Sequence, residues 1–355
     1  MQINTLKTFL FSILLATSFL GFASETDPEN DKPFDTKELI FHHIKDSHSF
    51  HVAGHLSIPL PVILWTKNGL TTFMSSEFQH DIDGKIIVEN NGQKFVNLHE
   101  KIYQLEDGVE TINFDKEHHP TNAVKPLDFS ITKNVFSMFL SMIVLVLLFF
   151  TAAKSYKKSA NGMPSGIAKF TEPIILFIRD EVAIPNIGEK KYKKYMPFLL
   201  TLFFFIWLNN IFGLIPFFPF SSNLSGNIAF TLSLAAITFV ITLFSSKKYY
   251  WKHMLWMPGL PVPMKLFLAP IEFMGMFIKP IALTIRLFAN ITAGHIIVLS
   301  LISLTFIFQN YVVGAGSVLF VVFISVIEVL VVAIQAYIFT MLSALYFGQA
   351  LEEEH

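Results

Sequence analysis

The sequence predicts an all-α polytopic membrane protein with a small β-rich domain in front of its membrane helices. Of the 355 residues, 52% are hydrophobic and only 15% are charged, which is more apolar than an ordinary soluble domain. Apolar runs without charge, long enough to cross a bilayer, recur after residue 130. Residues 24–130 are instead polar, and turn dipeptides separate their alternating runs. The chain has no cysteine, which excludes disulfides, thiolate metal sites and cysteine nucleophiles.

The first residues are typical of an export signal. Lys7 precedes an apolar core from Phe9 to Phe22, and the small residues Gly21 and Ala23 occupy the −3 and −1 positions of a cleavage site. We predict a signal peptide over residues 1–23, and the alternative is an uncleaved first anchor. Either version exports the segment that follows.

Residues 24–130 predict an extracytoplasmic (periplasmic) β-rich domain. Asn91-Gly92 separates "KIIVE" from "KFVNL", and Asp107-Gly108 separates "KIYQL" from "VETINF", so we expect two hairpins. The segment also holds nine of the twelve histidines, five of them in "HHIKDSHSFHVAGH" at residues 42–55. No helix or strand register brings these five together. We therefore favour solvated or interface histidines over the alternative of a metal site.

Five membrane spans are predicted in a membrane domain of residues 131–350, which a tail of residues 351–355 follows. They cover residues 135–153, 197–220, 228–245, about 266–308 and about 312–348. The last two exceed a perpendicular crossing, so we expect tilted helices that form an antiparallel hairpin around "FQNYVVGAG".

Lysine bias gives the orientation. "KSYKKS" and "GEKKYKKY" lie between the first two spans and "KKYYWKHM" follows the third, so these loops and the C-terminal tail should be cytoplasmic. The β-rich domain is then outside a bacterial inner (plasma) membrane, in agreement with the signal peptide. Residues 165–185 predict an amphipathic helix on the cytoplasmic face.

Ionisable groups are rare in the last two spans and are functional candidates, because inserting one costs about 2.5 to 3.5 kcal/mol even on lenient scales. The alternative is a snorkelling or structurally paired residue: snorkelling is an equal alternative for Lys279 and Glu272, but it does not explain Arg286. The polar and ionisable side chains considered in this region are Glu272, Lys279, Arg286, Asn290, His295, Glu328 and Gln335.

Their spacing predicts a polar stripe on each helix. Glu272, Lys279 and Arg286 recur every seven residues and share one face, with Asn290 one turn beyond. On the last helix Glu328 and Gln335 are likewise seven residues apart and should share a face.

Counting outward from a turn near residue 310 places Arg286 level with Gln335, and His295 level with Glu328 nearer the outside. Histidine and glutamate can exchange protons, whereas arginine stays charged. The pattern predicts two proton-access routes separated by a fixed cation.

Four stretches resemble one family: "FIWLNNIFGLIPF" (205–217), "SGNIAFTLSLA" (225–235), "KPIALTIRLFANITAGH" (279–295) and "IEVLVVAIQAYIFTMLSALYF" (327–347). Over about residues 131–350 the chain is similar to subunit a of the F-type ATP synthase. The resemblance implies a proton-translocating stator subunit with no cofactor, metal or catalytic site of its own. It also implies the c-ring, the subunit b peripheral stalk, the other synthase subunits and membrane lipid as partners. The outer domain is not part of the common family core.

The resemblance also implies roles. Arg286 would be the essential arginine that faces the ring carboxylates, with Gln335 as its neighbour on the last helix, and Asn290 matches the family's asparagine. His295 and Glu328 stand where the family places one acid and one histidine. The expected exit acid is Glu272, and the residues expected along the outer route are Asn209, Asn210 and Asn227.

Two other classes compete with this interpretation. A stand-alone proton- or sodium-coupled secondary transporter should show internal repeats, which we do not find in the sequence. An intramembrane histidine-metal enzyme needs clustered membrane histidines, and only His295 is available. The sequence also has no GxxxxGK[ST] loop, so we expect nucleotide chemistry on other subunits and no nucleic-acid partner.

Overall fold

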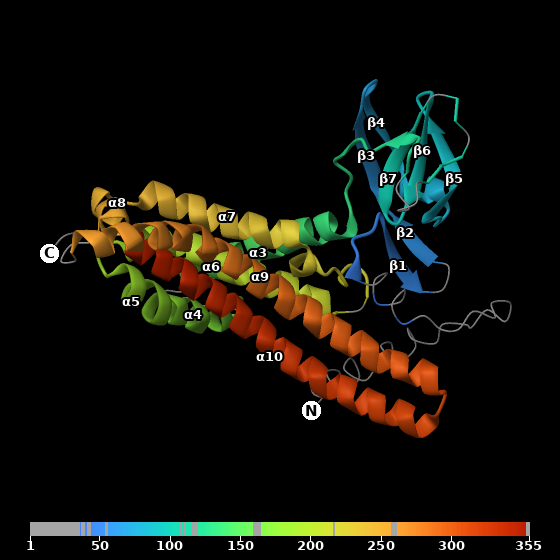
Figure 1. Ribbon diagram of the computed structural model, residues 1–355. Helices are drawn as coiled ribbons and strands as arrows, with labels where there is room; N and C mark the ends of the chain where they lie inside the picture. The colour runs from blue at the N-terminus through green and yellow to red at the C-terminus, as the bar shows by residue number, and fades with distance from the viewer. Residues whose placement is uncertain are drawn as a thin grey trace, which may run out of the picture. The chain divides into compact units, whose positions relative to one another are not determined.

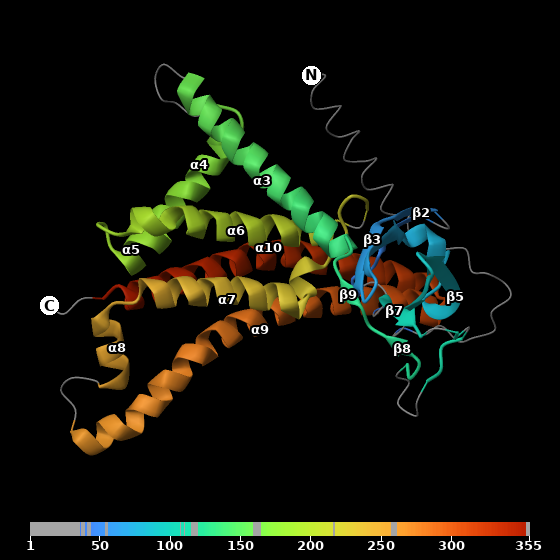
Figure 2. The ribbon, with the colours of Figure 1, turned by 90° about the horizontal axis from the view of Figure 1, so that it is seen from above.

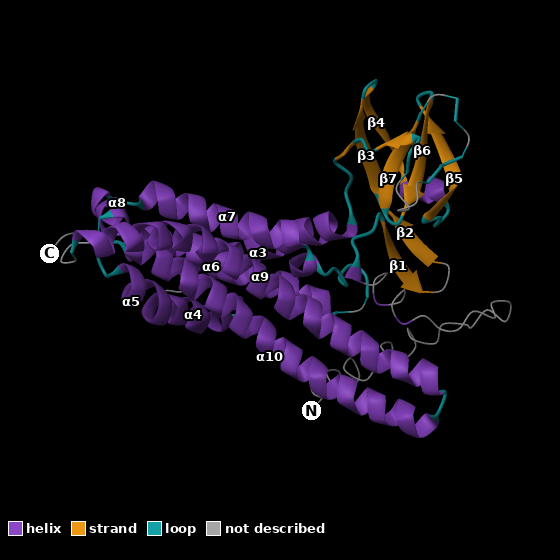
Figure 3. Ribbon diagram, in the orientation of Figure 1, coloured by secondary structure: helices purple, strands orange, loops and turns teal. Residues whose placement is uncertain are grey.

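The computed structural model describes residues 36, 40 and 44–352, except residues 54, 55, 107, 110, 115–119, 159–164, 216 and 257–260. The expected signal peptide, its cleavage site and the end of the C-terminal tail lie outside the described residues. The described chain forms two compact units. One contains residues 45–136 and 215–222 and holds the strands, and the other contains residues 137–214 and 223–352 and is helical (Figures 1 and 3).

The first unit is built from short antiparallel strands. β1 and β2 form a hairpin, a second sheet has the order β4-β3-β9, and a third has the order β5-β6-β7-β8. The strands are β1 (Ser49–Ala53), β2 (Leu56–Pro59), β3 (Pro61–Thr66), β4 (Gly69–Met74), β5 (Asp83–Asn90), β6 (Gln93–Leu98), β7 (Lys101–Leu105), β8 (Ala123–Val124) and β9 (Leu127–Asp128).

One of the two predicted hairpins is confirmed. Asn90 pairs with Gln93 across Asn91 and Gly92, which both have positive φ angles of 53° and 70° as a tight hairpin turn requires. The second prediction is wrong, because β7 pairs with β8 and residues 109–114 form no strand among those described.

The side chain of Asn122 explains the missing strand. Its Nδ2 donates to the Thr111 carbonyl at 2.7 Å, and its Oδ1 accepts from the Asn113 amide at 2.7 Å. These backbone groups are the ones that a neighbouring strand would need. The Asn122 side chain and the Thr121 amide, which donates to the Asn113 carbonyl at 2.8 Å, therefore bind backbone groups of the segment that the sequence pattern assigned to a strand.

The two larger sheets enclose an apolar core. Alternate residues of β3 point inward, so that Val62 and Leu64 are fully buried together with Phe95 and Ile102. A second aromatic cluster joins Phe50 of β1, Phe136 and Phe218, whose ring centroids are 5.3 to 6.1 Å apart. Residues 215–222 are thus packed as part of the first unit.

All five predicted spans are present as helices long and apolar enough to cross a membrane. The second ends at Leu214 instead of Phe220, because Pro216 and Pro219 lack the amide that continues a helix. The helices are α3 (Lys133–Lys158), α4 (Ile167–Phe177), α5 (Ile184–Ile187), α6 (Tyr192–Leu214), α7 (Ile228–Ser245), α8 (Lys248–Leu255), α9 (Val262–Phe308) and α10 (Tyr311–Ala350).

The segment predicted as one amphipathic helix is divided into α4, a π-helical turn at Ile178–Ala183, and α5. Ile178 and Val182 of this turn are fully buried in the core of the second unit. A methyl group on Gly348 of α10 would collide with the backbone carbonyl of Asn186 in α5. Glycine is therefore required at this crossing, which fixes the C-terminal end of α10 against α5.

Helices α9 and α10 pack against one another, and Figure 1 shows them side by side. Gln309 ends α9 in the left-handed conformation (φ 44°), and the side chain of Asn310 accepts from the Val312 amide at 2.9 Å to begin α10. Figure 2 also shows α9 bent, and Pro270 and Pro280 lie inside it. The antiparallel hairpin predicted from the sequence is confirmed.

Candidate functional site

The α9–α10 hairpin brings two of the predicted polar residues into direct contact. Nδ2 of Asn290 donates to Oε1 of Gln335 at 3.0 Å. Gln335 is only 2% exposed, because α6 and α9 cover this side of α10. This hydrogen bond connects the polar faces of α9 and α10 and orients the side chain of Gln335.

Arg286 lies one helical turn from Asn290, on the exposed side of α9. It forms no ion pair with any acid that the structure describes. The residue count placed Arg286 level with Gln335, whereas the hydrogen bond goes to Asn290, about one turn away. Counting from the turn gives depth along the axis only, and a hydrogen bond also depends on how each helix is rotated.

The acid of α10 is held against a glycine of α9. A methyl group on Gly294 would collide with Oε1 of Glu328, so the carboxyl group occupies the space that any larger residue would fill. His295 follows Gly294 directly and is half-buried. The expectation that His295 and Glu328 lie at similar depth therefore agrees with the packing, and sequence reasoning did not find the glycine that makes the approach possible.

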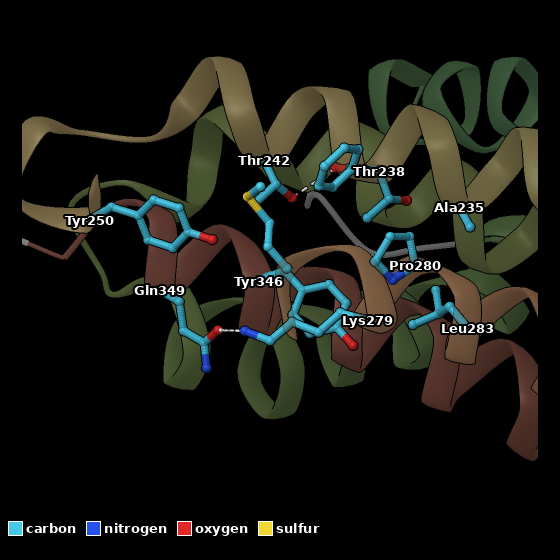
Figure 4. A pocket seen from close by; sticks show the side chains of 11 residues that line it. Ala235, Thr238, Thr242, Tyr250, Lys279, Pro280, Leu283, Tyr346 and Gln349 are labelled. Atoms are coloured by element: carbon cyan, nitrogen blue, oxygen red, sulfur yellow. Dashed lines mark hydrogen bonds between the residues drawn. The ribbon is translucent and has the colours of Figure 1, made fainter. Parts of the chain in front are cut away.

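Toward the other end of the hairpin, a small cavity lies between α7, α8, α9 and α10 (Figure 4). Nζ of Lys279 donates to Oε1 of Gln349 at 2.8 Å, and it lies 5.4 Å from the ring centre of Tyr346. The alternative to a functional role for this lysine was a snorkelling or structurally paired residue. The structure shows it hydrogen-bonded within the helix bundle.

Glu272, the expected exit acid, is exposed on α9 near this cavity. Tyr250 of α8 lines the cavity, and its hydroxyl group points toward it (Figure 4). Burial, and then the negative charge of Glu272, raise the pKa of the Tyr250 hydroxyl. Neither this tyrosine nor Gln349 stands out in the sequence, because a lone aromatic or amide near a helix end gives no pattern.

Further buried polar groups lie near the C-terminal end of α6. Asn209 and Asn210 are 1% and 4% exposed, and neither amide oxygen has a hydrogen-bond partner among the described residues. The short helical turn Leu224–Gly226 packs against α6, α7 and α9, and the buried Ser225 hydroxyl there likewise has no described partner. Buried polar groups without protein partners are rare and commonly bind water.

Asn227 has a structural explanation that the other two asparagines lack. Its Oδ1 accepts from the Ala229 amide at 3.0 Å and caps the N-terminus of α7. The family motif placed it with the outer route, and the structure shows a helix cap at that position.

Of the five histidines at residues 42–55, the structure describes the side chain of His48 alone. His48 is buried, with Oε2 of Glu100 3.8 Å from its Nδ1 and Oδ2 of Asp128 3.5 Å from its Nε2. These distances describe ion pairs and not hydrogen bonds. Among the described residues no group of three or more histidines and acids could hold a metal ion. His42, His43 and His55 lie outside the described residues, and so does the side chain of His51.

Together, five helices long and apolar enough to cross a membrane, two of them forming a hairpin that carries ionisable groups, define a polytopic membrane protein. A family model, ATP synthase A chain, matches residues 135–348, and a second, a domain of unknown function (DUF8433), matches residues 39–129. ATP synthase subunit a 2 of Chlorobaculum tepidum is 46% identical over 244 residues, which cover 67% of this chain and 68% of that protein. ATP synthase subunit a of Chloroherpeton thalassium is 41% identical over 266 residues, which cover 72% and 78%.

The chain therefore belongs to the family of proton-translocating a subunits of the F-type ATP synthase. It is a multi-pass membrane subunit that associates with other subunits of the synthase and has no catalytic site for ATP. The alternative of a stand-alone secondary transporter is thereby set aside.

Proposed function

We propose that the α9–α10 hairpin faces the c-ring and that Arg286 couples proton flow to ring rotation. The observation that carries the proposal is the position of Arg286: it lies on the exposed side of a membrane helix, with no described acid paired to it. A permanently charged group in a bilayer needs a counter-charge. A ring carboxylate that passes once per step supplies it.

In this proposal a proton enters along the side chains near the outer end of the hairpin. Asn209 and Asn210 supply buried amides that can hold water, and His295 and Glu328 exchange the proton with the ring. Neutralisation allows a ring carboxyl group to face lipid, since a neutral acid is much easier to desolvate than a carboxylate.

The proton leaves by a second route near Glu272 and the cavity of Figure 4. Arg286 lies between the two routes along α9. It attracts the newly formed carboxylate and, as a fixed cation, blocks direct passage of protons. Asn290 and Gln335 bind one another and keep the neighbouring helical surface in place.

Orientation and the remaining partners belong to the same proposal. The lysine-rich loops support a cytoplasmic position for the α3–α4 and α7–α8 connections, with the β-rich domain on the periplasmic side of a bacterial inner membrane. The peripheral stalk subunit b should bind the helical unit on a side other than the ring-facing one.

Replacement of Arg286 by alanine tests the proposal. We expect the Arg286→Ala complex to assemble, because an apolar residue is tolerated at this depth, but ATP synthesis and ATP-driven pumping should both be lost. Arg286→Lys should fail as well, because a compact and deprotonatable amine does not reproduce a planar guanidinium. ATP synthesis in proteoliposomes under an imposed proton gradient is the measurement, with subunit stoichiometry as the control for assembly. Near-normal synthesis by Arg286→Ala would refute the assignment.

A further inference from the structure

The β4-β3-β9 sheet of the outer domain has one face that covers the domain core and one that nothing described covers. Val62 and Leu64 of β3 point into the core, so Ile63 and Trp65 are on the opposite face. The face of an antiparallel sheet that contacts water is normally polar. Here Trp65 is 55% exposed.

Strand register extends this apolar surface across the whole sheet. Trp65 pairs with Leu70 of β4 on one side and with Leu127 of β9 on the other, so one row of side chains crosses all three strands. Leu70 is 56% exposed and Leu127 is 65% exposed. Phe129, two residues after Leu127, is 62% exposed. A contiguous patch of large apolar side chains in an exported domain marks an interaction surface.

The short connection between the patch and the first membrane helix indicates what covers the patch. Phe129 is separated by only three residues from Lys133, where the first membrane helix begins. Because an extended residue spans at most about 3.5 Å, Leu127 lies within about 21 Å of the helix start. Leu127 and Phe129 are thus close to the N-terminal end of α3, where the predicted first span begins.

Lysines at the edges of the patch also favour contact with a phospholipid surface. Lys67 follows Trp65 by two residues in the β3–β4 turn, and Lys125 precedes Leu127 by two; both lysines are exposed. Tryptophan combined with lysine is typical of the interfacial region, where rings lie at the head-group level and ammonium groups reach lipid phosphates.

We propose that this surface, formed by Trp65, Leu70, Leu127 and Phe129 and flanked by Lys67 and Lys125, binds the phospholipid surface beside the first span. The outer domain is then held on the bilayer by its β4-β3-β9 sheet as well as by its covalent connection to α3. The surface lies outside the ion-translocating hairpin and does not depend on the roles proposed for its residues.

Single cysteines provide the direct test, because the natural chain has none. Leu70→Cys and Leu127→Cys would carry nitroxide labels in the assembled synthase in liposomes, and Glu89→Cys on β5 of the other large sheet is the matched control. We expect the ratio of oxygen to aqueous nickel-chelate accessibility to be severalfold higher at the two patch positions than at Glu89. The complex with the cysteine-free chain gives the background.

Two outcomes would overturn the proposal. Equal access of the nickel chelate at Leu127 and Glu89 would show that the patch faces water. Protection from both oxygen and nickel would show that a protein surface covers it, either another subunit or a second copy of this chain.

The unaltered protein provides a second measurement, independent of any effect of the substitutions on folding. A photoactivatable phospholipid should form adducts on peptides that contain β3–β4 and β9 but not on those that contain β5–β6. Peptides from α3, whose Phe139, Ile143 and Val146 are exposed, serve as the positive control. Labelled α3 peptides without adducts on β3–β4 and β9 would refute lipid binding.

Discussion

The β-rich domain and the α9–α10 hairpin differ in whether the chain itself supplies a counter-charge for a charged side chain. In the outer domain His48 is buried between two carboxylates, and the Ser130 amide donates to one of them, Asp128, at 2.8 Å. In the hairpin Arg286 lies on the exposed side of a helix with no described counter-charge. A buried charge that the chain itself pairs is costly to leave without its partner, whereas a charge without a described counter-charge on a membrane helix supports the proposal that another subunit supplies one.

The largest effect is expected from a substitution at Gly294, which contacts Glu328 in the hairpin. In Gly294→Ala the methyl group would collide with Oε1 of Glu328, the end of a flexible side chain, so the carboxyl group must move. With Glu328 in the proposed proton-entry role, we expect ATP synthesis to fall roughly tenfold or more, because a shift of about 1 Å in a reacting group can cost two orders of magnitude. Gly275→Ala is the matched control, since a Cβ at this other α9 glycine meets no atom within 4 Å. Synthesis rates in proteoliposomes give the comparison. Equal rates for the two variants would show that the position of Glu328 does not matter.

The second prediction concerns the coupling between His295 and Glu328 in the α9–α10 hairpin. We expect either single change to alanine to slow proton entry, and the exchange His295→Glu with Glu328→His to be more active than the product of the two single defects predicts. The pair keeps one acid and one imidazole at similar depth after the exchange. The measurement is proton uptake driven by ATP hydrolysis in a double-mutant cycle, and strictly additive losses would show two independent groups.

In the outer domain, removal of a paired charge should change stability and leave transport intact. Burial by itself lowers the pKa of His48, but Asp128 and Glu100 outweigh it and raise the pKa to about 9 from 6.5, which corresponds to roughly 3 kcal/mol. We expect His48→Gln to destabilise the domain by about this amount. Pulse proteolysis of the outer domain in urea, in the intact complex, measures the loss, with the exposed His99→Asn as the control. Wild-type rates of ATP synthesis should persist.

The same pair predicts a pH window. The folded-state pKa of His48 is raised, so its contribution is fully present below pH 6.5 and disappears as the pH rises through about 9. Burial alone would raise the pKa of Asp128, but His48 and the Ser130 contacts hold it below its usual value. The contribution of Asp128 is therefore present above about pH 4 and is lost as the pH falls through its lowered pKa. A urea midpoint that does not change between pH 7 and pH 10 would contradict this account.

The smallest effect is expected at Asn227, where substitutions distinguish a helix-capping role from a role in the proton route. Asn227→Ala should destabilise α7 by about 1 kcal/mol, and Asn227→Ser, which can also cap a helix, should recover most of that loss. Rates of proton uptake should remain close to wild type in both variants. A strong transport defect in Asn227→Ser with normal thermal stability of the complex would assign this residue to the route.

The sequence by itself determined the elements that local rules control. Bilayer thickness fixed the five spans, the loop between two long apolar runs fixed the α9–α10 hairpin, and Asn91-Gly92 fixed one turn. The unusual position of Arg286 was also evident, because a cation in an apolar run stands out without any knowledge of its neighbours.

Only the tertiary structure decided which groups meet. The partner of Gln335 is Asn290, Glu328 packs on a glycine, and Lys279 binds Gln349, because these contacts depend on the rotation and bending of two helices as well as on residue spacing. Asn122 likewise replaced an expected strand by binding backbone groups about ten residues away in sequence. Periodicity encodes which face of an element a residue occupies, whereas the partner of that face is selected by packing between segments far apart in the chain.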